Sequence, residues 1–179
     1  SFKKTVHIFS HYFMHSKEQA DEYTKLFGIK TSQLFKCGDF SLPFEEKLIG
    51  TPIKMVYAGR LYCNRWRSLA AIGEALREIN KGGIKMVLDV YTQDLLTNKQ
   101  RASLCEENFI FVKGAVPASA LAKIYNETDI ALHVESFDKR YKYATRVSFS
   151  TKIVDLMASS CAILAICWEK HCGYQYLEE

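Results

Sequence analysis

The stretch V-S-F-S-T-K-I-V-D-L-M-A-S-S-C-A-I-L-A-I, from Val147 to Ile166, has three parts with different patterns. Val147–Thr151 is polar and has no apolar face that a helix could bury. Lys152–Ser160 carries apolar residues at helical spacing, which predicts a short helix. Ala162–Ile166 is a continuous apolar run, which is typical of a strand buried in a parallel sheet. This order of loop, helix and buried strand indicates an α/β fold.

The loop before this helix is rich in hydroxyl groups. Ser150 and Thr151 precede Lys152 and Ile153, where the first backbone N–H groups of a helix are unpaired and the helix dipole is positive. Such a helix start is suited to binding an anion. The alternative is ordinary capping, in which Ser150 or Thr151 closes a helix that packs on the sheet. This stretch by itself favours capping, and the rest of the chain adds weight to the anion site.

The composition excludes several classes of protein. The chain has 179 residues, of which 48% are hydrophobic, so it can bury a sizeable core. Its net charge of +4 comes without a clustered stripe of Lys and Arg, so we expect phosphorylated small molecules or an anionic surface as partners and no nucleic acid. The six cysteines form no C-x-x-C pair, which predicts reduced thiols in a cytoplasmic protein. No membrane span or signal peptide is visible.

Three histidines, His7, His11 and His15, recur at four-residue spacing near the N-terminus. On a helix they would form a stripe of metal ligands. No carboxylate or cysteine completes the ligand set, and the intervening apolar residues suit a strand equally well. We therefore expect no metal there.

The pattern of the chain changes near residue 53. Before it, Ser16–Phe27 is predicted to be a helix that Ser16 caps and Gly28 ends, and Ile29–Pro52 is predicted to be a connector. After it, strands and helices alternate with short connections, which predicts a Rossmann-like parallel sheet of five strands with helices on both faces. The expected strands are Ile53–Ala58, Lys85–Tyr91, Phe109–Val112, Ile130–Val134 and Ala162–Ile166. The expected helices between them are Arg67–Asn80, Asn98–Cys105, Ala118–Glu127 and Lys152–Ser160, with a basic loop at Asp138–Ser150 and the start of another helix at Glu169–Leu177.

Ligands of such sheets bind outside the carboxyl ends of the strands. Gly59 follows the first strand directly and lets the backbone approach a ligand closely. Arg60 and Arg65 come next, and two guanidinium groups facing a helix N-terminus would hold a diphosphate. Taken singly, each arginine is more simply a solvated surface residue. Together with the hydroxyl-rich loop, they favour the diphosphate site.

Two further positions suggest contacts with a nucleoside. Gly114 ends the third strand, where a flat base could lie against bare backbone, or where the glycine could simply form a turn. Asp155 lies one turn into the helix on the side of Lys152, and a carboxylate there can accept hydrogen bonds from ribose hydroxyls. The alternative for Asp155 is an i, i+3 ion pair with Lys152.

These residues carry a resemblance to a known family. The motifs V-Y-A-G-R-L, F-V-K-G-A-V-P, I-Y-N-E-T-D-I-A-L and S-T-K-I-V-D-L-M-A-S-S-C-A-I-L follow one another between Ile53 and Ile166. This ordered set resembles the C-terminal half of a GT-B glycosyltransferase of the group 1 type (family four). In that family the C-terminal half is a Rossmann-like lobe that binds a nucleotide-sugar. The arginine of G-R-L and a following basic residue, which match Arg60 and Arg65, hold the diphosphate.

The resemblance extends the list of candidate site residues. It implies that Gly114, Ala115 and Val116 lie near the base and that Asp155 meets the ribose. It also implies a domain boundary, with residues 1–52 as the connector and remnant of an N-terminal, acceptor-binding half and residues 53–179 as the nucleotide-sugar-binding domain, truncated at its C-terminus.

The chain departs from the family pattern at one segment. The family often has two glutamates in an E-x7-E pattern, and the first of them matches Val147. The usual E-G-F-G segment is replaced by V-S-F-S, whereas Ser150–Ile153 resembles a branch of the family with S-x-x-K-I before the helix. Nucleotide binding is therefore implied more directly than contacts to the sugar.

The resemblance implies a donor-binding domain of a retaining glycosyltransferase, which transfers a sugar from a nucleoside diphosphate sugar to a glycan, lipid or protein. No cofactor and no metal are expected. The expected partners are the nucleotide-sugar and the missing acceptor-binding half. The expected location is the cytoplasm, with peripheral contact at the inner face of the cell membrane allowed for the full-length protein. The alternative is a non-catalytic, degenerate transferase-like module that acts in interaction or regulation.

Overall fold

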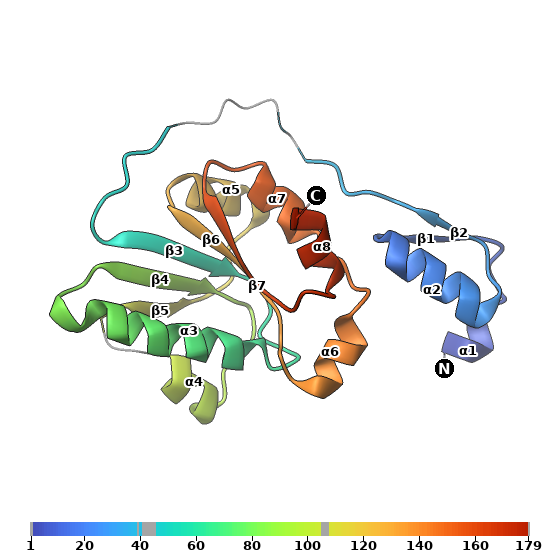
Figure 1. The fold of residues 1–179 in the computed structure, drawn as a ribbon, viewed down its shortest axis with the longest axis horizontal. Coiled ribbons are helices and arrows are strands. Elements are labelled where there is room, and N and C mark those ends of the chain that lie inside the picture. Colours follow the sequence, from blue (N-terminus) through green and yellow to red (C-terminus); the bar gives the residue numbers. More distant parts are fainter. Residues whose placement is uncertain (1, 39, 41–45, 105–107, 179) are drawn as a thin grey trace.

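A five-stranded parallel sheet organises the chain from residue 53 onward (Figure 1). The computed structural model describes residues 2–38, 40, 46–104 and 108–178. The strands are β3 (Ile53–Ala58), β4 (Met86–Tyr91), β5 (Ile110–Lys113), β6 (Ile130–Val134) and β7 (Ala162–Ile166). Their order across the sheet is β5-β4-β3-β6-β7, and every neighbouring pair is parallel. The predicted α/β fold with a parallel sheet is confirmed. The expectation that Ala162–Ile166 is a buried strand is wrong, because β7 lies at the edge of the sheet and Ala162 and Leu164 are exposed.

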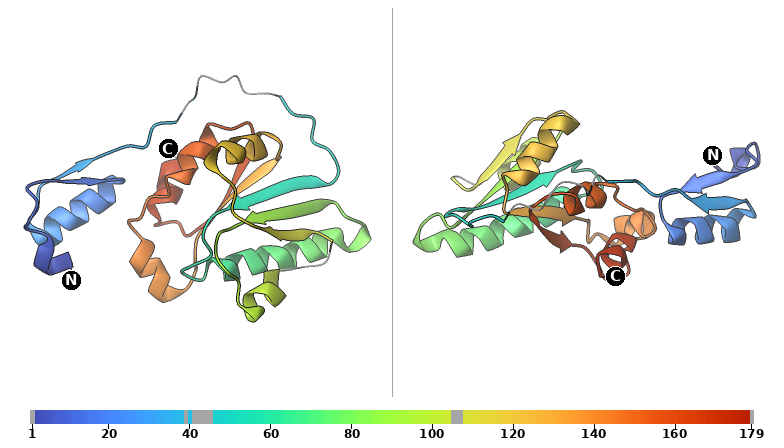
Figure 2. Two further views of the ribbon diagram at one scale, coloured as in Figure 1. Left: turned by 180° about the vertical axis from the view of Figure 1, so that it is seen from behind. Right: turned by 90° about the horizontal axis from the view of Figure 1, so that it is seen from above.

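Helices cover both faces of this sheet (Figure 2). Successive side chains of a strand point to opposite faces, so β3 contributes Met55 and Tyr57 to one core and Val56 and Ala58 to another. The first core includes residues of α3 (Arg65–Ile79) and α4 (Asn98–Leu104). The second includes residues of α5 (Ala118–Asn126) and α7 (Lys152–Met157). Both faces of the central strand are therefore dry, which explains its continuous apolar sequence.

Helix α3 shows how periodicity selects the buried face. Leu69, Ile72 and Leu76 recur at helical spacing and are buried against the sheet. Ile79, which shares their spacing in the sequence, is 42% exposed because α3 ends there and a 3-10 turn, η1 (Asn80–Gly82), leads the chain away. The helical spacing of Ile79 predicts that it packs inward with the other three, and that prediction is wrong for this reason.

Two segments after β6 differ from the sequence predictions. The expected basic loop Asp138–Ser150 contains a helix, α6 (Lys139–Thr145). The helix expected at Lys152–Ser160 is shorter, since α7 ends at Met157. The Ser159 hydroxyl donates to the Leu156 carbonyl at 2.6 Å, and this side-chain bond competes with continuation of the helix. The last helix, α8 (Cys172–Glu178), lies within the region where another helix was expected.

The N-terminal residues form a small unit of their own. It contains α1 (Phe2–Thr5), β1 (Tyr12–Met14), α2 (Lys17–Phe27) and β2 (Thr31–Gln33), and the two strands pair in parallel. Ser16 caps α2 by accepting from the Gln19 N–H, and Gly28 ends it with a left-handed backbone (φ 62°), as predicted. The strand β2 lies in a segment predicted to be a connector, part of which, residues 39 and 41–45, lies outside the described residues.

Side-chain contacts of this unit, and of Lys36 just after it, join it to the larger sheet domain among the described residues. The Ser16 hydroxyl donates to the Val147 carbonyl at 3.0 Å, and Glu22 pairs with Arg146. Lys36 pairs with Asp155 of α7 at 2.5 Å. All three contacts reach the segment that runs from the end of α6 to α7, so the unit lies on the α6 and α8 side of the sheet (Figure 1). Whether residues 52 and 53 mark a domain boundary stays a prediction.

Two further predictions concern the state of the cysteines and the presence of a membrane-spanning helix. Cys37, Cys63, Cys161, Cys167 and Cys172 are free thiols, as predicted, and Cys105 lies outside the described residues. None of the helices in the described part of the chain is both long enough and apolar enough to cross a bilayer.

The packing of α3 predicts a contrast between two substitutions on one helix. Leu69 is fully buried, so Leu69→Ala should lower the free energy of unfolding by about 2–5 kcal/mol through lost transfer energy and a residual cavity. Ile79→Ala, on the exposed end, should change it by no more than about 0.5 kcal/mol. Urea denaturation monitored by circular dichroism measures both. Equal effects would contradict the described packing of α3.

Candidate functional site

A pocket of about 210 Å³ opens at the carboxyl ends of β3 and β6. Its lining includes polar side chains from the strand ends and from the loop before α7. They are Arg60, Tyr62, Arg65, His133, Glu135, Ser148, Ser150, Thr151 and Lys152. This is the edge where ligands bind in open α/β sheets. The pocket is therefore the candidate site.

Lys152 lies over the backbone at the end of β3. Its Nζ donates to the Ala58 carbonyl at 2.9 Å, and its side chain passes Gly59 so closely that a Cβ built on Gly59 would lie 2.0 Å from Nζ. A side chain at position 59 would therefore displace the ammonium group. Gly59 thus leaves the space that the end of the Lys152 side chain occupies.

The surroundings of Lys152 lower the pKa of its ammonium group. Burial lowers its pKa to about 8, and the nearby Arg65 charge acts in the same direction, while Glu135 and Asp94 act against it. Among the residues that the structure describes, no carboxylate forms an ion pair with Lys152. An anion in the pocket would supply the missing negative charge and raise this pKa.

Arg65 and Glu135 form a buried ion pair in the wall of the pocket. Arg65 begins α3 and donates from Nη2 to both Glu135 oxygens, at 2.8 and 2.9 Å, and from Nε at 3.1 Å. The two side chains are 14% and 4% exposed. Burial acts to lower the pKa of Arg65, but the Glu135 carboxylate more than offsets it, so the net pKa is raised. Arg65 thus already has a carboxylate partner.

Arg60 is the more available of the two arginines. Its guanidinium is 58% exposed and lies 3.6 Å from Asp94, which is a loose ion pair. Its backbone is anchored, since the Tyr57 hydroxyl donates to the Arg60 carbonyl at 2.7 Å. Asp94 also accepts from the Leu61 N–H, so the carboxylate stays in place if the Arg60 side chain moves. The Gln93 amide oxygen also accepts from the Arg60 Nη2 and Nε, at 2.9 and 2.7 Å, in the amide orientation that satisfies both groups. To turn toward an anion in the pocket, the Arg60 side chain would exchange these contacts for the anion, while its backbone stays anchored.

The loop before α7 brings hydroxyl groups to the opposite wall. Ser148, Ser150 and Thr151 line the pocket. The alternative of ordinary capping is not observed, because Thr151 stands at the cap position in a helical conformation and its side chain caps no N–H group. The Ile153 N–H donates to the Ser150 carbonyl at 3.0 Å and its side chain is fully buried, so Ile153 does not face the pocket. Helix α7 has only six residues, so Lys152 supplies more positive charge here than the helix dipole.

Four predicted residues lie away from this pocket. Gly114, Ala115 and Val116 follow β5, the edge strand, and β4 separates that strand from β3. A Cβ on Gly114 would meet no atom within 4 Å, so nothing in the described structure requires a glycine there. Asp155 pairs with Lys36 and lines a pocket other than the one that Lys152 lines. The alternative of an ion pair between Asp155 and Lys152 is not observed, since Asp155 pairs with Lys36.

Sequence reasoning missed several polar residues of the site, among them Tyr57, His133 and Glu135. Tyr57 lies inside β3, and His133 and Glu135 lie at the end of β6, within or next to apolar runs. Burial lowers the pKa of His133 to about 3, with His171 and Lys152 acting in the same direction. A polar residue that interrupts a buried strand at its carboxyl end is the signal that could have identified His133.

The N-terminal histidines do not form the helical stripe that a metal site would need. His11 and His15 flank β1 rather than a helix. The His11 Nε2 contacts the Ser32 hydroxyl at 2.9 Å, and the His15 Nδ1 contacts the Leu34 carbonyl at 3.2 Å. Each ring thus pairs with its neighbouring strand.

Comparison with known proteins supports the fold. No protein-family model matches the chain, and no curated protein matches it. Among solved structures, the chain is similar to the pneumococcal O-GlcNAc transferase GtfA, whose crystal structure contains UDP and GlcNAc. The TM-score is 0.63 at 16% identity, over 93% of this chain and 32% of that protein. The chain therefore has the fold of one part of a GT-B glycosyltransferase and spans about a third of the length of that relative.

The burial of the Arg65–Glu135 pair predicts that Glu→Gln costs much more stability at position 135 than in an exposed ion pair. Glu135→Gln leaves the Arg65 charge buried without a counter-charge and should lower the free energy of unfolding by about 3 kcal/mol or more. Glu78→Gln, in the exposed Lys81–Glu78 pair, should cost less than about 1 kcal/mol. Urea titration of both variants tests this. A loss for Glu135→Gln no larger than that for Glu78→Gln would show that the buried pair does not hold the pocket wall.

Proposed function

We propose that this chain is the donor-binding lobe of a glycosyltransferase and that its central pocket holds the diphosphate of a nucleoside diphosphate sugar. The observation that carries the proposal is the position of Lys152. Its ammonium group lies in a pocket at the strand ends, over bare backbone at Gly59 and without a carboxylate partner among the described residues. The fold shared with a transferase whose structure contains UDP supports this choice of ligand.

The proposal assigns different roles to the two arginines. Arg60, which is exposed and loosely paired, would bind the diphosphate together with Lys152 and the hydroxyls of Ser150 and Thr151. Arg65, which is held by Glu135, would shape the pocket and add positive potential. This division departs from the expectation that both arginines contact phosphate directly.

In the full-length protein this arrangement would stabilise a leaving group. As the bond between the sugar and the diphosphate oxygen breaks, negative charge grows on the diphosphate, where Lys152 and Arg60 would neutralise it. The sugar would pass to an acceptor hydroxyl with retention of configuration, and the acceptor would bind to a part of the protein outside this chain. The ribose role of Asp155 and the base-binding role of Gly114, Ala115 and Val116 remain predictions, and the Lys36–Asp155 pair would have to open for the first. A cytoplasmic location and peripheral membrane contact also remain predictions.

The charge of Lys152 predicts that UDP binding depends on pH. Its pKa of about 8 in the free protein should rise when the diphosphate binds, so affinity is greatest below pH 8 and falls as pH rises through that value. From pH 7 to pH 9 the affinity should drop by about tenfold. Isothermal titration calorimetry at several pH values measures it.

Two variants at position 152 act as controls for this dependence. Lys152→Met should bind UDP weakly at every pH. Lys152→Arg keeps a charge that does not titrate in this range and should show a flat profile. If wild type and Lys152→Arg lose affinity equally between pH 7 and pH 9, Lys152 is not the group that senses the ligand.

A second prediction separates phosphate contacts from other contacts. Arg60→Ala should weaken UDP binding by about 1.5 kcal/mol, the lower end for a hydrogen bond to a charged group, and should leave uridine binding unchanged. Arg67→Ala, an exposed arginine that pairs with Asp138, is the matched control and should change neither affinity. Equal losses of UDP and uridine for Arg60→Ala would remove Arg60 from the phosphate site.

The alternative function is a non-catalytic module with a transferase-like fold. The replacement of the family glutamate by Val147 favours it. Saturation-transfer NMR with UDP, GDP, CDP and ADP discriminates the two. Contact with none of the four nucleotides would overturn the donor-binding proposal.

A further inference from the structure

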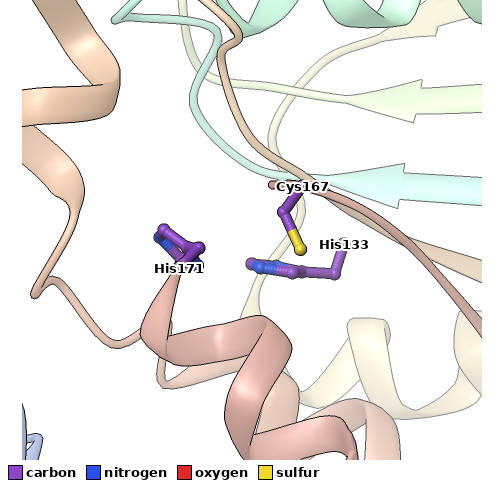
Figure 3. Close-up of side chains that lie close together, drawn as sticks. All are labelled: His133, Cys167 and His171. Carbon is purple, nitrogen blue, oxygen red and sulfur yellow. The ribbon is translucent and has the colours of Figure 1, made fainter. Parts of the chain in front are cut away.

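Three metal-ligating side chains from separate segments meet beside the pocket. His133 lies in β6, Cys167 follows β7 directly, and His171 precedes α8. The strands β6 and β7 are neighbours, with His133 opposite Ala165. The chain turns after β7 and brings Cys167 and His171 back over the His133 ring (Figure 3).

The donor atoms of this cluster are close to the spacing of a metal site. One ligand atom from each of the three residues lies within 4.8 Å of the others. In a tetrahedral zinc site, bonds of about 2.0–2.3 Å place the ligand atoms about 3.3–3.8 Å apart. Small side-chain rotations that bring each atom inward by about 1 Å would therefore close the set.

The two rings also carry polar atoms without partners. His133 is 5% exposed and His171 is fully buried. Within the described part of the chain, the Nε2 atoms of both rings are buried and accept or donate no hydrogen bond. Buried polar atoms almost always have a partner, so orphaned ring nitrogens on two histidines that cluster with one thiol indicate a missing ligand.

A hydrogen bond to His171 determines which ring nitrogen carries the proton before a metal binds. The Gly173 N–H donates to the His171 Nδ1 at 3.1 Å, which places the proton of the neutral ring on Nε2, where it has no acceptor among the described residues. A metal bound through Nε2 requires the ring proton to move to Nδ1, and the Gly173 contact then opens. Gly173 itself is confined, since a Cβ there would lie about 3.0 Å from the His171 Nδ1 and 3.1 Å from the His133 Nε2.

We propose that His133, Cys167 and His171 form a zinc site with three protein ligands. Two imidazoles and one thiolate are a ligand set that Zn²⁺ prefers, and a site with three protein ligands leaves a fourth position for water. On binding, the Cys167 thiol releases its proton to solvent and its sulfur bonds to the ion. Cys167 is partly exposed, so the ion has a path to the ligands.

Local charge is compatible with a bound cation. The thiolate supplies one negative charge, and the nearby Arg65 charge is neutralised by Glu135. Lys152 adds one positive charge near His133, and both residues line the pocket. The site would act as a clamp that ties the segment after β7 to the end of β6, in the wall of the pocket.

The test uses the 179-residue chain without a histidine tag. After removal of metal with a chelator, Co²⁺ is added as a spectroscopic substitute for Zn²⁺. We expect a thiolate-to-cobalt charge-transfer band and intense visible bands typical of tetrahedral cobalt, at a stoichiometry of one ion per chain. Zn²⁺ added afterwards should displace the cobalt and raise the thermal unfolding temperature, because an ion that binds only the folded state stabilises it.

Matched variants identify the ligands. Cys167→Ser and His171→Gln should each weaken zinc affinity by at least about 100-fold, since losing a group that merely orients a ligand already costs about 10–100-fold. Cys37→Ser, at an exposed thiol, and His11→Gln, outside the cluster, are the controls and should bind the ion like wild type.

Two results would overturn the zinc site. The first is a wild-type chain that binds neither ion at micromolar concentration. The second is cobalt binding that Cys37→Ser or His11→Gln weakens as much as Cys167→Ser does. Circular dichroism of each variant without metal shows whether it is folded. If Cys167→Ser is not folded, Cys167→Ala takes its place. These outcomes do not depend on nucleotide binding, which is measured separately.

Discussion

The buried pair of Arg65 and Glu135 is the interaction on which the pocket depends. It joins the first residue of α3 to the residue after β6, and the Ser68 hydroxyl strengthens the same junction by donating to the Glu135 carbonyl at 2.8 Å. Parallel strands diverge at their carboxyl ends because each must turn into a helix. A bidentate ion pair across that gap keeps the ends of β3 and β6 at a constant separation. The space that remains beside the pair is the pocket.

The same pair determines which cation is available for a ligand. Because Glu135 satisfies Arg65, the carboxylate does not neutralise Lys152. Its ammonium group donates to the Ala58 carbonyl and lies over the Tyr57 ring, 5.5 Å from the ring centroid. Lys152 also occupies the space that the missing side chain of Gly59 leaves open. A cation that is partly desolvated and lacks a counter-charge is costly to bury, so its retention in a folded protein favours a functional role over a structural one. Lys152 thus differs from Arg60 and Arg65, each of which has a carboxylate partner.

The wall of the pocket continues into the histidine and cysteine cluster. His133 contacts both, because the side chain lies at the end of β6 between the pocket and the turn after β7. The small N-terminal unit reaches the other side of the same region through Ser16, Glu22 and Lys36. The segment from the end of α6 to α7 is therefore held from several directions, which is consistent with a loop that must keep its hydroxyl groups in place.

The sequence by itself determined the parallel sheet, its five strands and the helices on its two faces. These follow from local periodicity and from apolar runs such as those of β3 and β7, which depend only on neighbours along the chain. It also placed Gly59, Arg60 and Lys152 at one edge, because the carboxyl ends of parallel strands share an edge. It predicted the cap at Ser16 and the end of α2 at Gly28, since both depend on a few adjacent residues.

Only the tertiary structure decided which side chains pair. Sequence reasoning placed Arg65 on phosphate, Asp155 beside Lys152 and residues 114–116 near the ligand. In the fold, Arg65 meets Glu135, Asp155 meets Lys36 and the edge strand β5 lies two strands from the pocket. The cluster of His133, Cys167 and His171 has no signature along the chain, because its members come from the end of one strand and the turn after another. Ion pairs and ligand sets depend on strand order and on the rotation of each helix about its axis. Those are set by packing between elements distant in sequence, and no local pattern encodes them.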